Sequence, residues 1–426
     1  MADILITDAE RALADLFEAR AAHFTARPLD RSRAEAFERF AAAGLPHRRV
    51  EAYKYTDLKA KLRTLPPAAA PMPAEDIAEA LANHAPLPGV AGRIVIANGR
   101  YVPTMSDAPG VTVADILDPA ADLCGVGTLV AGNTDPLTLA NASLFEGGVV
   151  IAVTGEAPLI EILHVVAEGV LVMGRVAVTL AQGAHARFVE RVVGAEAAVV
   201  NNLTELTIPD GARGDWIRIA HGEAASSTHL ASFHTSLGEK SQLEHLTIST
   251  GAGLSRGQIF ALVGGDEAAA NFRTATISVG QRHADSTLVV RHDALNSTST
   301  EEFRSAVGQG GASIVQGRII VDPGAQKTDA KMMSRGLYLD DDGEMVNKPE
   351  LEIFADDVQC GHGATSGDLN EDMVFYLRAR GIPETEARRL LVEAFLLEAL
   401  DRIDDEPLHE ALATHLTEAL AEAGAS

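Results

Sequence analysis

The sequence predicts a mainly β protein in which a right-handed parallel β-helix is flanked by α-helical domains at both ends. Helical periodicity is confined to the two ends, strand-like runs fill the middle, and turn glycines recur there about every 28 residues, a period typical of solenoids. Parallel crossover connections are almost always right-handed, which predicts the hand of the coil. We therefore expect an N-terminal helical domain over 1–90, a β-helix over 91–366 and a C-terminal helical domain over 367–426.

The N-terminal helical domain carries two helix-start signals. Thr7 and Glu10 have the spacing of a capping box, and apolar residues follow them at helical intervals. Ser32 and Glu35 repeat the pattern, so we expect a second helix to begin there. Gly44 is a common kind of helix stop and predicts where that helix ends.

The connection to the middle of the chain contains an unusual aromatic and basic cluster. A Tyr-Lys-Tyr-Thr run occupies 53–56 within the segment 46–58, in a chain that is only 4% aromatic. We interpret this segment as a packed loop or short helix that joins two domains. The proline-rich run 66–73 predicts a semi-rigid spacer and a soft domain boundary, and a short helix is expected over 77–81.

The middle of the chain reads as β-structure from Arg93 onward, and we expect no helix there for roughly two hundred residues. Asn98 and Gly99 between short apolar runs predict a β-hairpin. The strand-like runs that follow are 149–153, 159–166, 176–180, 187–193, 203–208, 216–219, 243–248, 258–263, 286–290 and 314–321.

The turn glycines between these runs form two interleaved series. The first is Gly183, Gly211, Gly238 and Gly265, and the second is Gly194, Gly222, Gly251, Gly280 and Gly308. Two strands and two turns in each step describe the coil of a parallel β-helix whose inward residues form a continuous core. The alternative is a β-sandwich, which is expected to show hairpin turns at closer and less regular spacing.

Helical periodicity returns after Thr365. Pro383 is expected near the start of a helix, residues 404–407 interrupt it, and a final helix is expected over 408–420. The apolar stripe of the first of these helices comprises Ala387, Leu390, Leu391, Ala394, Phe395 and Leu397. This stripe either caps the solenoid or docks a partner protein, and the sequence allows both.

Composition excludes several classes of function. The formal net charge of −25 argues against nucleic acid and anionic membranes as partners, and no apolar run is long enough to cross a membrane. Two cysteines, Cys124 and Cys360, cannot form a disulfide framework, so we expect a reducing, cytoplasmic compartment. The chain has no phosphate-binding GxxxxGK[ST] loop, GxSxG elbow or HExxH motif. We therefore expect that the chain does not hydrolyse ATP by a P-loop mechanism.

The candidate metal ligands are Cys360 and His362, which lie two residues apart in an extended segment and therefore point to the same side of it. A thiolate beside an imidazole suits iron or zinc. Two ligands are too few for a closed site, so the others would come from elsewhere in the fold, from a partner chain or from inorganic sulfide. The alternative is a buried cysteine next to a turn histidine.

Several ordered motifs carry a resemblance to a known family. They are Arg49-x-Glu51-x-Tyr53-Lys54-Tyr55-Thr56, Lys331-Met-Met-Ser-x-Gly336, Asn347-Lys-Pro-Glu350-Leu-x-Ile and Asp357-Val-x-Cys360-x-His362-Gly-Ala-Thr365. Together they resemble the SufB/SufD family of iron–sulfur cluster assembly proteins, and the SufD branch most closely. The resemblance spans nearly the whole chain.

The resemblance implies a right-handed parallel β-helix that serves as a scaffold in a complex with a SufB-like subunit and a SufC-like ABC ATPase. It implies that the ATPase hydrolyses ATP, whereas this chain is not an enzyme and binds no nucleotide. It implies that Cys360 and His362 hold iron and sulfide of a transient cluster at the interface with the SufB-like subunit. It also implies that the ATPase docks on the C-terminal helices. The docking residues implied are Pro383, Ala387, Leu390, Leu391, Ala394 and Phe395.

Three other interpretations remain open at the level of the sequence. A SufB-like subunit would accept sulfur on Cys360, or on Cys124, which lies outside any recognised motif. A homodimer would form when the chain is alone. A carbohydrate-active β-helix enzyme is a lesser alternative, because the strand region has a single tryptophan, Trp216, for stacking on sugars.

Overall fold

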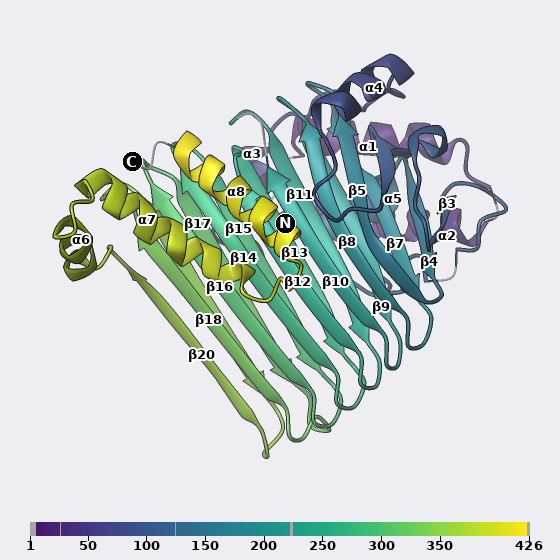
Figure 1. Cartoon of the computed structure of the whole chain (residues 1–426). Helices are drawn as coiled ribbons and strands as arrows, with labels where there is room; N and C mark the ends of the chain where they lie inside the picture. The colour runs from purple at the N-terminus through teal and green to yellow at the C-terminus, as the bar shows by residue number, and fades with distance from the viewer. Residues whose placement is uncertain (1–5, 26, 124, 222–224, 424–426) are drawn as a thin grey trace.

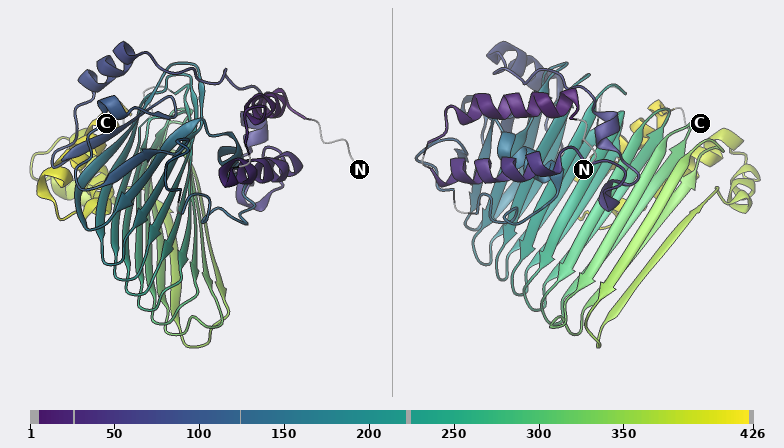
Figure 2. Two further views of the ribbon diagram at one scale, coloured as in Figure 1. Left: turned by 90° about the vertical axis from the view of Figure 1, so that its right-hand side faces the viewer. Right: turned by 180° about the vertical axis from the view of Figure 1, so that it is seen from behind.

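The computed structural model describes residues 6–25, 27–123, 125–221 and 225–423. It confirms a mainly β chain, with a solenoid core and helices at both ends (Figure 1). Two long sheets face each other, and from β7 to β20 the chain alternates between them, so that each coil contributes one strand to each sheet (Figure 2).

The first sheet has the strand order β2-β1-β5-β8-β10-β12-β14-β16-β18-β20. Its strands are β1 (Gly92–Ala97), β2 (Arg100–Tyr101), β5 (Glu156–Val166), β8 (His185–Gly194), β10 (Arg213–His221), β12 (Gln242–Thr250), β14 (Ala269–Val279), β16 (Thr298–Gly308), β18 (Asp329–Tyr338) and β20 (Gln359–Gly367). The β1–β2 pair is antiparallel, which confirms the hairpin predicted from Asn98 and Gly99.

The second sheet has the order β19-β17-β15-β13-β11-β9-β7-β4-β3, with β6 paired to β9. Its strands are β3 (Thr112–Asp115), β4 (Gly147–Val153), β6 (Leu171–Val172), β7 (Gly174–Leu180), β9 (Val199–Ile208), β11 (Thr228–Leu237), β13 (Leu254–Val263), β15 (His283–His292), β17 (Ala312–Val321) and β19 (Glu344–Ile353).

The strand register confirms the coil length predicted from the glycines. Hydrogen-bonded neighbours along the first sheet are in register at residues 185, 213, 242, 269, 298, 329 and 359, so successive coils differ by 27 to 31 residues. These pairings are parallel, whereas a sandwich would require antiparallel hairpins. Gly222 of the second glycine series lies outside the described residues.

Apolar side chains from both sheets fill the space between them. Trp216 is fully buried between Phe188 and Phe233, with ring centroids 5.3 Å away on each side. Phe272 and Phe303 extend the same core toward later coils. Burying each of these rings contributes about 2–3 kcal/mol, so the interior rather than local propensity holds the coils in register.

The structure contains elements that the sequence pattern did not predict. A helix, α5 (Pro136–Leu144), interrupts the region expected to be free of helix, and nearly all of it is buried under the N-terminal helices. Strands β11, β14 and β16 were also missed, because their inward positions carry serine, threonine and alanine beside the apolar residues. Such strands lack the clean apolar alternation used to recognise a strand.

The N-terminal helices cover the outer face of the second sheet (Figure 2). They are α1 (Asp8–Ala21), α2 (Pro28–Ala43), the 3₁₀ turn η1 (Glu51–Tyr53) and α3 (Leu58–Lys61). The capping box of Thr7 and Glu10 is confirmed, with both reciprocal bonds present. The predicted helix start at Ser32 is wrong, because α2 already begins at Pro28.

The chain between α3 and the first long strands of the solenoid forms shorter elements. Helix α4 (Ala74–Asn83) confirms and extends the helix expected over 77–81, and it packs Ile77 against the first sheet. A second 3₁₀ turn, η2, spans Pro103–Met105.

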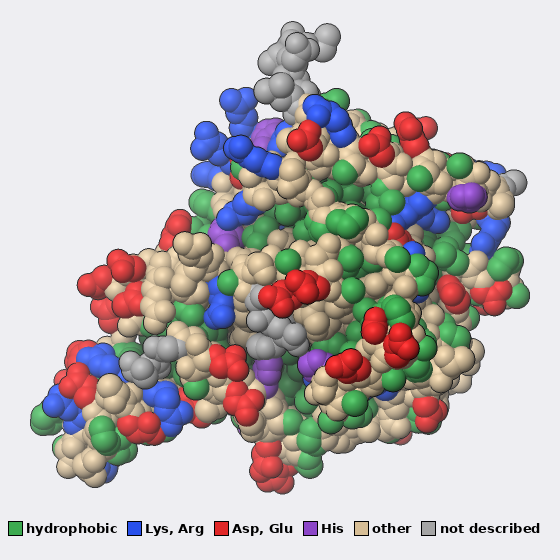
Figure 3. All heavy atoms as spheres, turned by 90° about the horizontal axis from the view of Figure 1, so that it is seen from above, with side chains coloured by type: hydrophobic (Ala, Val, Ile, Leu, Met, Phe, Trp, Pro, Cys, Tyr) green, Lys and Arg blue, Asp and Glu red, His purple; other side chains and the backbone are tan. Residues whose placement is uncertain are grey.

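Acidic side chains are spread over the face seen in Figure 3, in keeping with the net charge of −25.

The C-terminal helices lie across the outer face of the first sheet, opposite the N-terminal layer (Figure 1). They are α6 (Glu371–Arg378), α7 (Glu384–Leu397), the 3₁₀ turn η3 (Glu398–Leu400) and α8 (Glu406–Glu422). Pro383 directly precedes α7, as expected. No helix in the described part of the chain has the length and apolar character needed to cross a membrane.

The two ends of the solenoid differ. At the start, antiparallel pairs β1–β2 and β3–β4 close the sheets. At the other end, among the described residues, β20 pairs only with β18 and β19 only with β17, so each has one edge without a neighbouring strand there. The last coil is therefore open. The turn expected at 340–343 connects β18 to β19.

Candidate functional site

Cys360 and His362 lie on β20, the last strand of the first sheet. The parallel register pairs Ala330 with Cys360 and Met332 with His362. Paired residues on neighbouring parallel strands point to the same face, and both Ala330 and Met332 are buried in the core between the sheets. Cys360 and His362 therefore share the inward face at the open end, which confirms that the two side chains lie on one side of a strand.

The two side chains differ in exposure. Cys360 is half-buried and packs against the core, whereas His362 is exposed. Burial raises the pKa of the Cys360 thiol above its usual value, and the carboxyl groups of Asp329 and Glu301 raise it further, against a lowering backbone hydrogen bond from Ala330. The resting side chain is therefore a thiol that loses its proton only when a cation stabilises the thiolate.

The floor of this site comes from the two motifs that precede it. Met332 points inward from β18, and its sulfur occupies space that a Cβ at Gly317 on the opposite sheet would fill. The Ser334 hydroxyl donates a 2.6 Å hydrogen bond to Asn347 Oδ1 and so ties β18 to β19. These motifs hold the last coils together beneath Cys360 and His362.

The site is incomplete within one chain. In the part of the chain that the structure describes, no group of three or more histidine, cysteine, aspartate or glutamate side chains is placed to hold a metal ion. Cys360 and His362 thus supply at most two ligands, where iron and zinc sites in proteins usually have four. Of the three sources of further ligands left open by the sequence, namely the rest of the fold, a partner chain and inorganic sulfide, the first finds no support among the described residues.

The Tyr-Lys-Tyr-Thr segment is a structural anchor. The Tyr53 hydroxyl donates a 2.6 Å hydrogen bond to Asp135, and the Arg256 guanidinium lies 4.0 Å from the Tyr53 ring centroid. Arg256 forms a fully buried ion pair with Asp285, which also accepts a hydrogen bond from the Thr56 hydroxyl. The segment therefore fastens the N-terminal layer to the second sheet, as a packed connection between domains would.

One further contact links this anchor to the open end. Glu51, at the start of the 3₁₀ turn, forms a 2.5 Å ion pair with Lys348 of β19, and Lys348 also lies 3.3 Å from Glu350. Two motifs that are nearly three hundred residues apart in the sequence thus meet on the last coil. The N-terminal layer reaches the strand that borders the candidate site.

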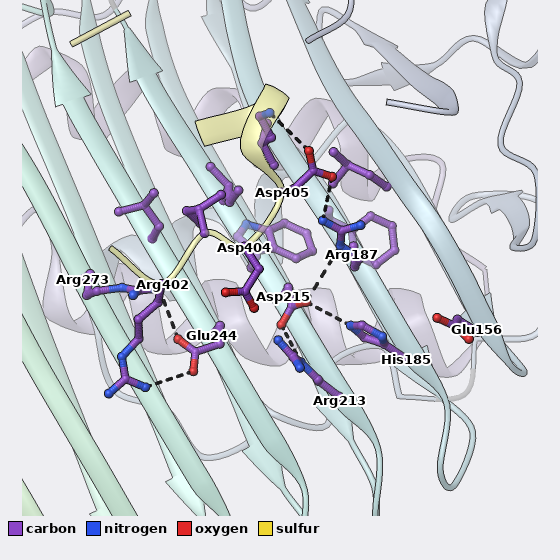
Figure 4. A pocket seen from close by; sticks show the side chains of 17 residues that line it. Glu156, His185, Arg187, Arg213, Asp215, Glu244, Arg273, Arg402, Asp404 and Asp405 are labelled. Atoms are coloured by element: carbon purple, nitrogen blue, oxygen red, sulfur yellow. Dashed lines mark hydrogen bonds and ion pairs between the residues drawn. The ribbon is translucent and has the colours of Figure 1, made fainter. Parts of the chain in front are cut away.

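A cavity of about 360 Å³ lies elsewhere, between the first sheet and the loop that joins α7 to α8 (Figure 4). Asp215 lies 2.9 Å from His185 Nε2 and accepts a 3.0 Å hydrogen bond from Arg213 Nε. Glu244 likewise accepts a 3.1 Å hydrogen bond from Arg273. Because these carboxylates already pair with histidine and arginine side chains, we interpret the cavity as a charged joint, that is, an ion-paired contact between the C-terminal helices and the first sheet.

The C-terminal residues implied as a docking surface differ in exposure. Ala387 is buried against the fold, whereas Leu390, Leu391 and Phe395 are half-buried. The remaining two, Pro383 and Ala394, are exposed. The contacts with the solenoid come mainly from Val392, Leu396 and Leu400 of the same segment.

The most exposed apolar side chains of this region lie on α6, which the sequence analysis did not single out. Phe375 is 71% exposed, Tyr376 51% and Met373 48%. Helix α6 lies beyond the solenoid coils and packs on α7 (Figure 2). The docking surface, as the structure presents it, is centred on α6 and the free side of α7.

Sequence reasoning also missed Glu301, an acid sealed in the interior near the site. It is paired with Met332, and Met332 with His362, so it lies two strands below His362 on the same inward ladder. The coil period alone could not have found it, because the steps from 301 to 332 and from 332 to 362 are 31 and 30 residues, whereas the glycine period is about 28. Cys124, the alternative sulfur acceptor, lies outside the described residues.

Comparison with known proteins agrees with this architecture. Residues 163–395 match the family model described as "SUF system FeS cluster assembly, SufBD core domain", and residues 7–64 match "SufBD protein N-terminal region". The iron–sulfur cluster assembly protein SufD of Escherichia coli is 28% identical over 388 residues, covering 86% of this chain and 87% of its own length.

Two further relatives show the same breadth of similarity. An iron–sulfur cluster assembly SufBD family protein of Synechocystis is 27% identical, and the match covers 84% of each chain. A SufBD family protein of Mycobacterium tuberculosis is 28% identical over 72% of this chain and 79% of its own.

Proposed function

Because the chain belongs to the SufBD family of iron–sulfur cluster assembly proteins, we propose that it is a SufD-like scaffold subunit that helps to acquire iron and form a nascent cluster. The observation that carries this proposal is the position of Cys360 and His362. Both point inward at the open end of the solenoid, on an edge strand that lacks a partner. A site completed by a second chain requires this arrangement.

The proposed partner at the open end is a SufB-like subunit with a solenoid of its own. The free edges of β19 and β20 present backbone groups that a strand of another chain can hydrogen-bond. Ile353 and Phe354 are exposed beside them, which supplies apolar contact area. A partner seated there would place its own side chains within reach of His362 and complete the ligand set.

The proposed partner at the C-terminal helices is a SufC-like ABC ATPase. The exposed ring of Phe375 and its neighbours on α6 form an apolar surface of the kind that marks a protein interface. Pro383, Leu390, Leu391 and Ala394 would extend the contact along α7. ATP-driven movement of this partner would then shift the helices, and the charged joint of Figure 4 is where they meet the first sheet.

The chemistry assigned to this chain is ligation of iron and sulfide as cargo. A neutral imidazole binds iron without first losing a proton at neutral pH, so His362 is the leading ligand. Cys360 joins as a thiolate when the cation arrives. Its raised pKa disfavours a role as the principal sulfur-accepting nucleophile of a SufB-like subunit, because the thiolate is the nucleophile. We place the complex in the cytoplasm.

The test is to co-express the chain with its SufB-like and SufC-like partners, purify the complex anaerobically, and measure iron and acid-labile sulfide. His362→Ala is expected to leave the complex assembled and to lose most of its iron. Gln359→Ala is the matched control, because Gln359 lies on the same strand but faces the opposite side. If His362→Ala retains the iron of the wild type, Cys360 and His362 are structural and the proposal fails.

A further inference from the structure

Glu301 occupies the interior of the solenoid just below the candidate site. On the first sheet it pairs with Phe272 on one side and with Met332 on the other, and Met332 pairs with His362. Met332 therefore separates the carboxyl group from His362. The spacing between neighbouring strands places Glu301 and His362 about 10 Å apart along this ladder.

The carboxyl group of Glu301 is sealed from water and has no counter-ion. The side chain is fully buried, and neither carboxyl oxygen has a hydrogen-bond partner with good geometry. The Ser299 hydroxyl is the one described group that favours its charged form, and that hydroxyl lies 2.9 Å from His292. Burial raises the pKa of Glu301 to about 8, so the group is mostly protonated at neutral pH.

The titratable groups around Glu301 leave it without a cation. Among the described residues, those that face it are His292 on β15, Cys360 on β20 and, beyond Phe272, His245 on β12. Burial lowers the pKa of His292 to about 4 and that of His245 to about 3, so both are neutral at pH 7. A buried acid without a partner is costly, which calls for an explanation in terms of function.

We propose that Glu301 is the charge-compensating group of the site at Cys360 and His362. Its carboxyl group is neutral while no cation is held there and releases its proton to bulk water when a divalent cation binds. The bound cation then faces a carboxylate in the interior instead of a neutral core. This inference rests on the proposed function, because it assumes that Cys360 and His362 hold iron.

The size of the coupling follows from the separation. A ferrous ion with one thiolate has a net charge of one, and at about 10 Å with an effective dielectric constant of roughly 20 it lowers the pKa of Glu301 by about 1.2. Linkage then predicts that about half a proton leaves Glu301 for each iron bound at pH 7. The carboxylate strengthens iron binding about 1.5-fold at pH 6.5 and about ninefold at pH 8.

The experiment measures ferrous iron binding to the complex with its partner subunits, by anaerobic calorimetry in buffers of different ionisation enthalpy. Wild type is compared with Glu301→Gln, which keeps the shape and removes the titration. Glu302→Gln is the matched control, since Glu302 is the next residue on β16 and faces outward. Infrared difference spectra of wild type and Glu301→Gln, without iron, report whether a protonated carboxyl group is present.

Three results support the inference together: a protonated-carboxyl band that Glu301→Gln removes, about half a proton less released per iron by that variant at pH 7, and an affinity gap that widens toward pH 8. Equal proton release and equal pH dependence in both proteins, with iron bound through His362, would overturn the role of Glu301 and leave the proposed function intact. Failure of the wild-type complex to bind iron would overturn both.

Discussion

Replacing Arg256 by methionine will destabilise the protein by about 3–5 kcal/mol, because it leaves the buried carboxylate of Asp285 without its cation. Both side chains of this pair are 0% exposed. The guanidinium also stacks on the Tyr53 ring and donates a 3.0 Å hydrogen bond to the Ala52 carbonyl. After the change, Asp285 keeps only the hydroxyl donors of Thr56 and Thr287.

Urea unfolding is the assay, followed by the fluorescence of Trp216, the single tryptophan, and by circular dichroism. Arg256→Met combined with Asp285→Leu will regain more than half of the loss, since no unpaired charge then remains. Arg291→Met is the matched control. It breaks an Arg291–Asp322 pair between neighbouring coils whose arginine is 55% exposed, and it will cost less than about 1 kcal/mol.

The reasoning is refuted if Arg256→Met costs no more than Arg291→Met, or if the double variant is less stable than the single one. Either result would mean that the buried carboxylate of Asp285 does not need the charge of Arg256 for the protein to be stable. The anchor that fastens the N-terminal layer would then be the apolar contact of the Tyr53 ring alone.

Four other predictions follow from the structure. In urea unfolding, Glu301→Gln will stabilise the chain by roughly 2–3 kcal/mol at pH 7 and will have no effect at pH 4. The reason is that the pKa of Glu301 is about 8 in the folded state and 4.5 in the unfolded state, so the wild-type protein loses stability as the pH rises between these values. The Tm of His245→Phe will fall less than that of the wild type between pH 6.5 and pH 4. The pKa of His245 is about 3 in the folded state, below the usual 6.5, so the wild-type protein loses stability as the pH falls. Trp216→Ala will cost about 3–5 kcal/mol in urea unfolding followed by circular dichroism alone, since the ring is fully buried. Phe375→Glu will weaken binding of the ATPase partner on the order of tenfold in calorimetry with Tm unchanged, because Phe375 is exposed.

The solenoid was predictable because glycines recur at its turns with regular spacing. Gly183, Gly194, Gly211 and Gly280 adopt positive φ angles at the turns, a conformation that glycine takes without steric cost. Strand β11 was not recognisable from its sequence, since histidine, serine and threonine are mixed with its apolar residues. Tertiary burial between two sheets, and not its own propensity, makes it a strand.

The candidate site was predictable only in part. The spacing of Cys360 and His362 sufficed to place both side chains on one face of a strand. It did not say which face points inward, because coil lengths vary between 27 and 31 residues and the register accumulates this variation. Glu301 was therefore out of reach of the sequence, since its position below His362 depends on two successive coils.

The open last coil has a consequence for how the protein is produced. A chain that presents two strand edges without neighbours, with Phe354 exposed beside them, will pair with any extended segment it meets at high concentration. Overexpression of this subunit alone is therefore expected to yield aggregates or self-paired species. A cell that makes the subunit gains from matching its synthesis, molecule for molecule, to that of whatever covers this end.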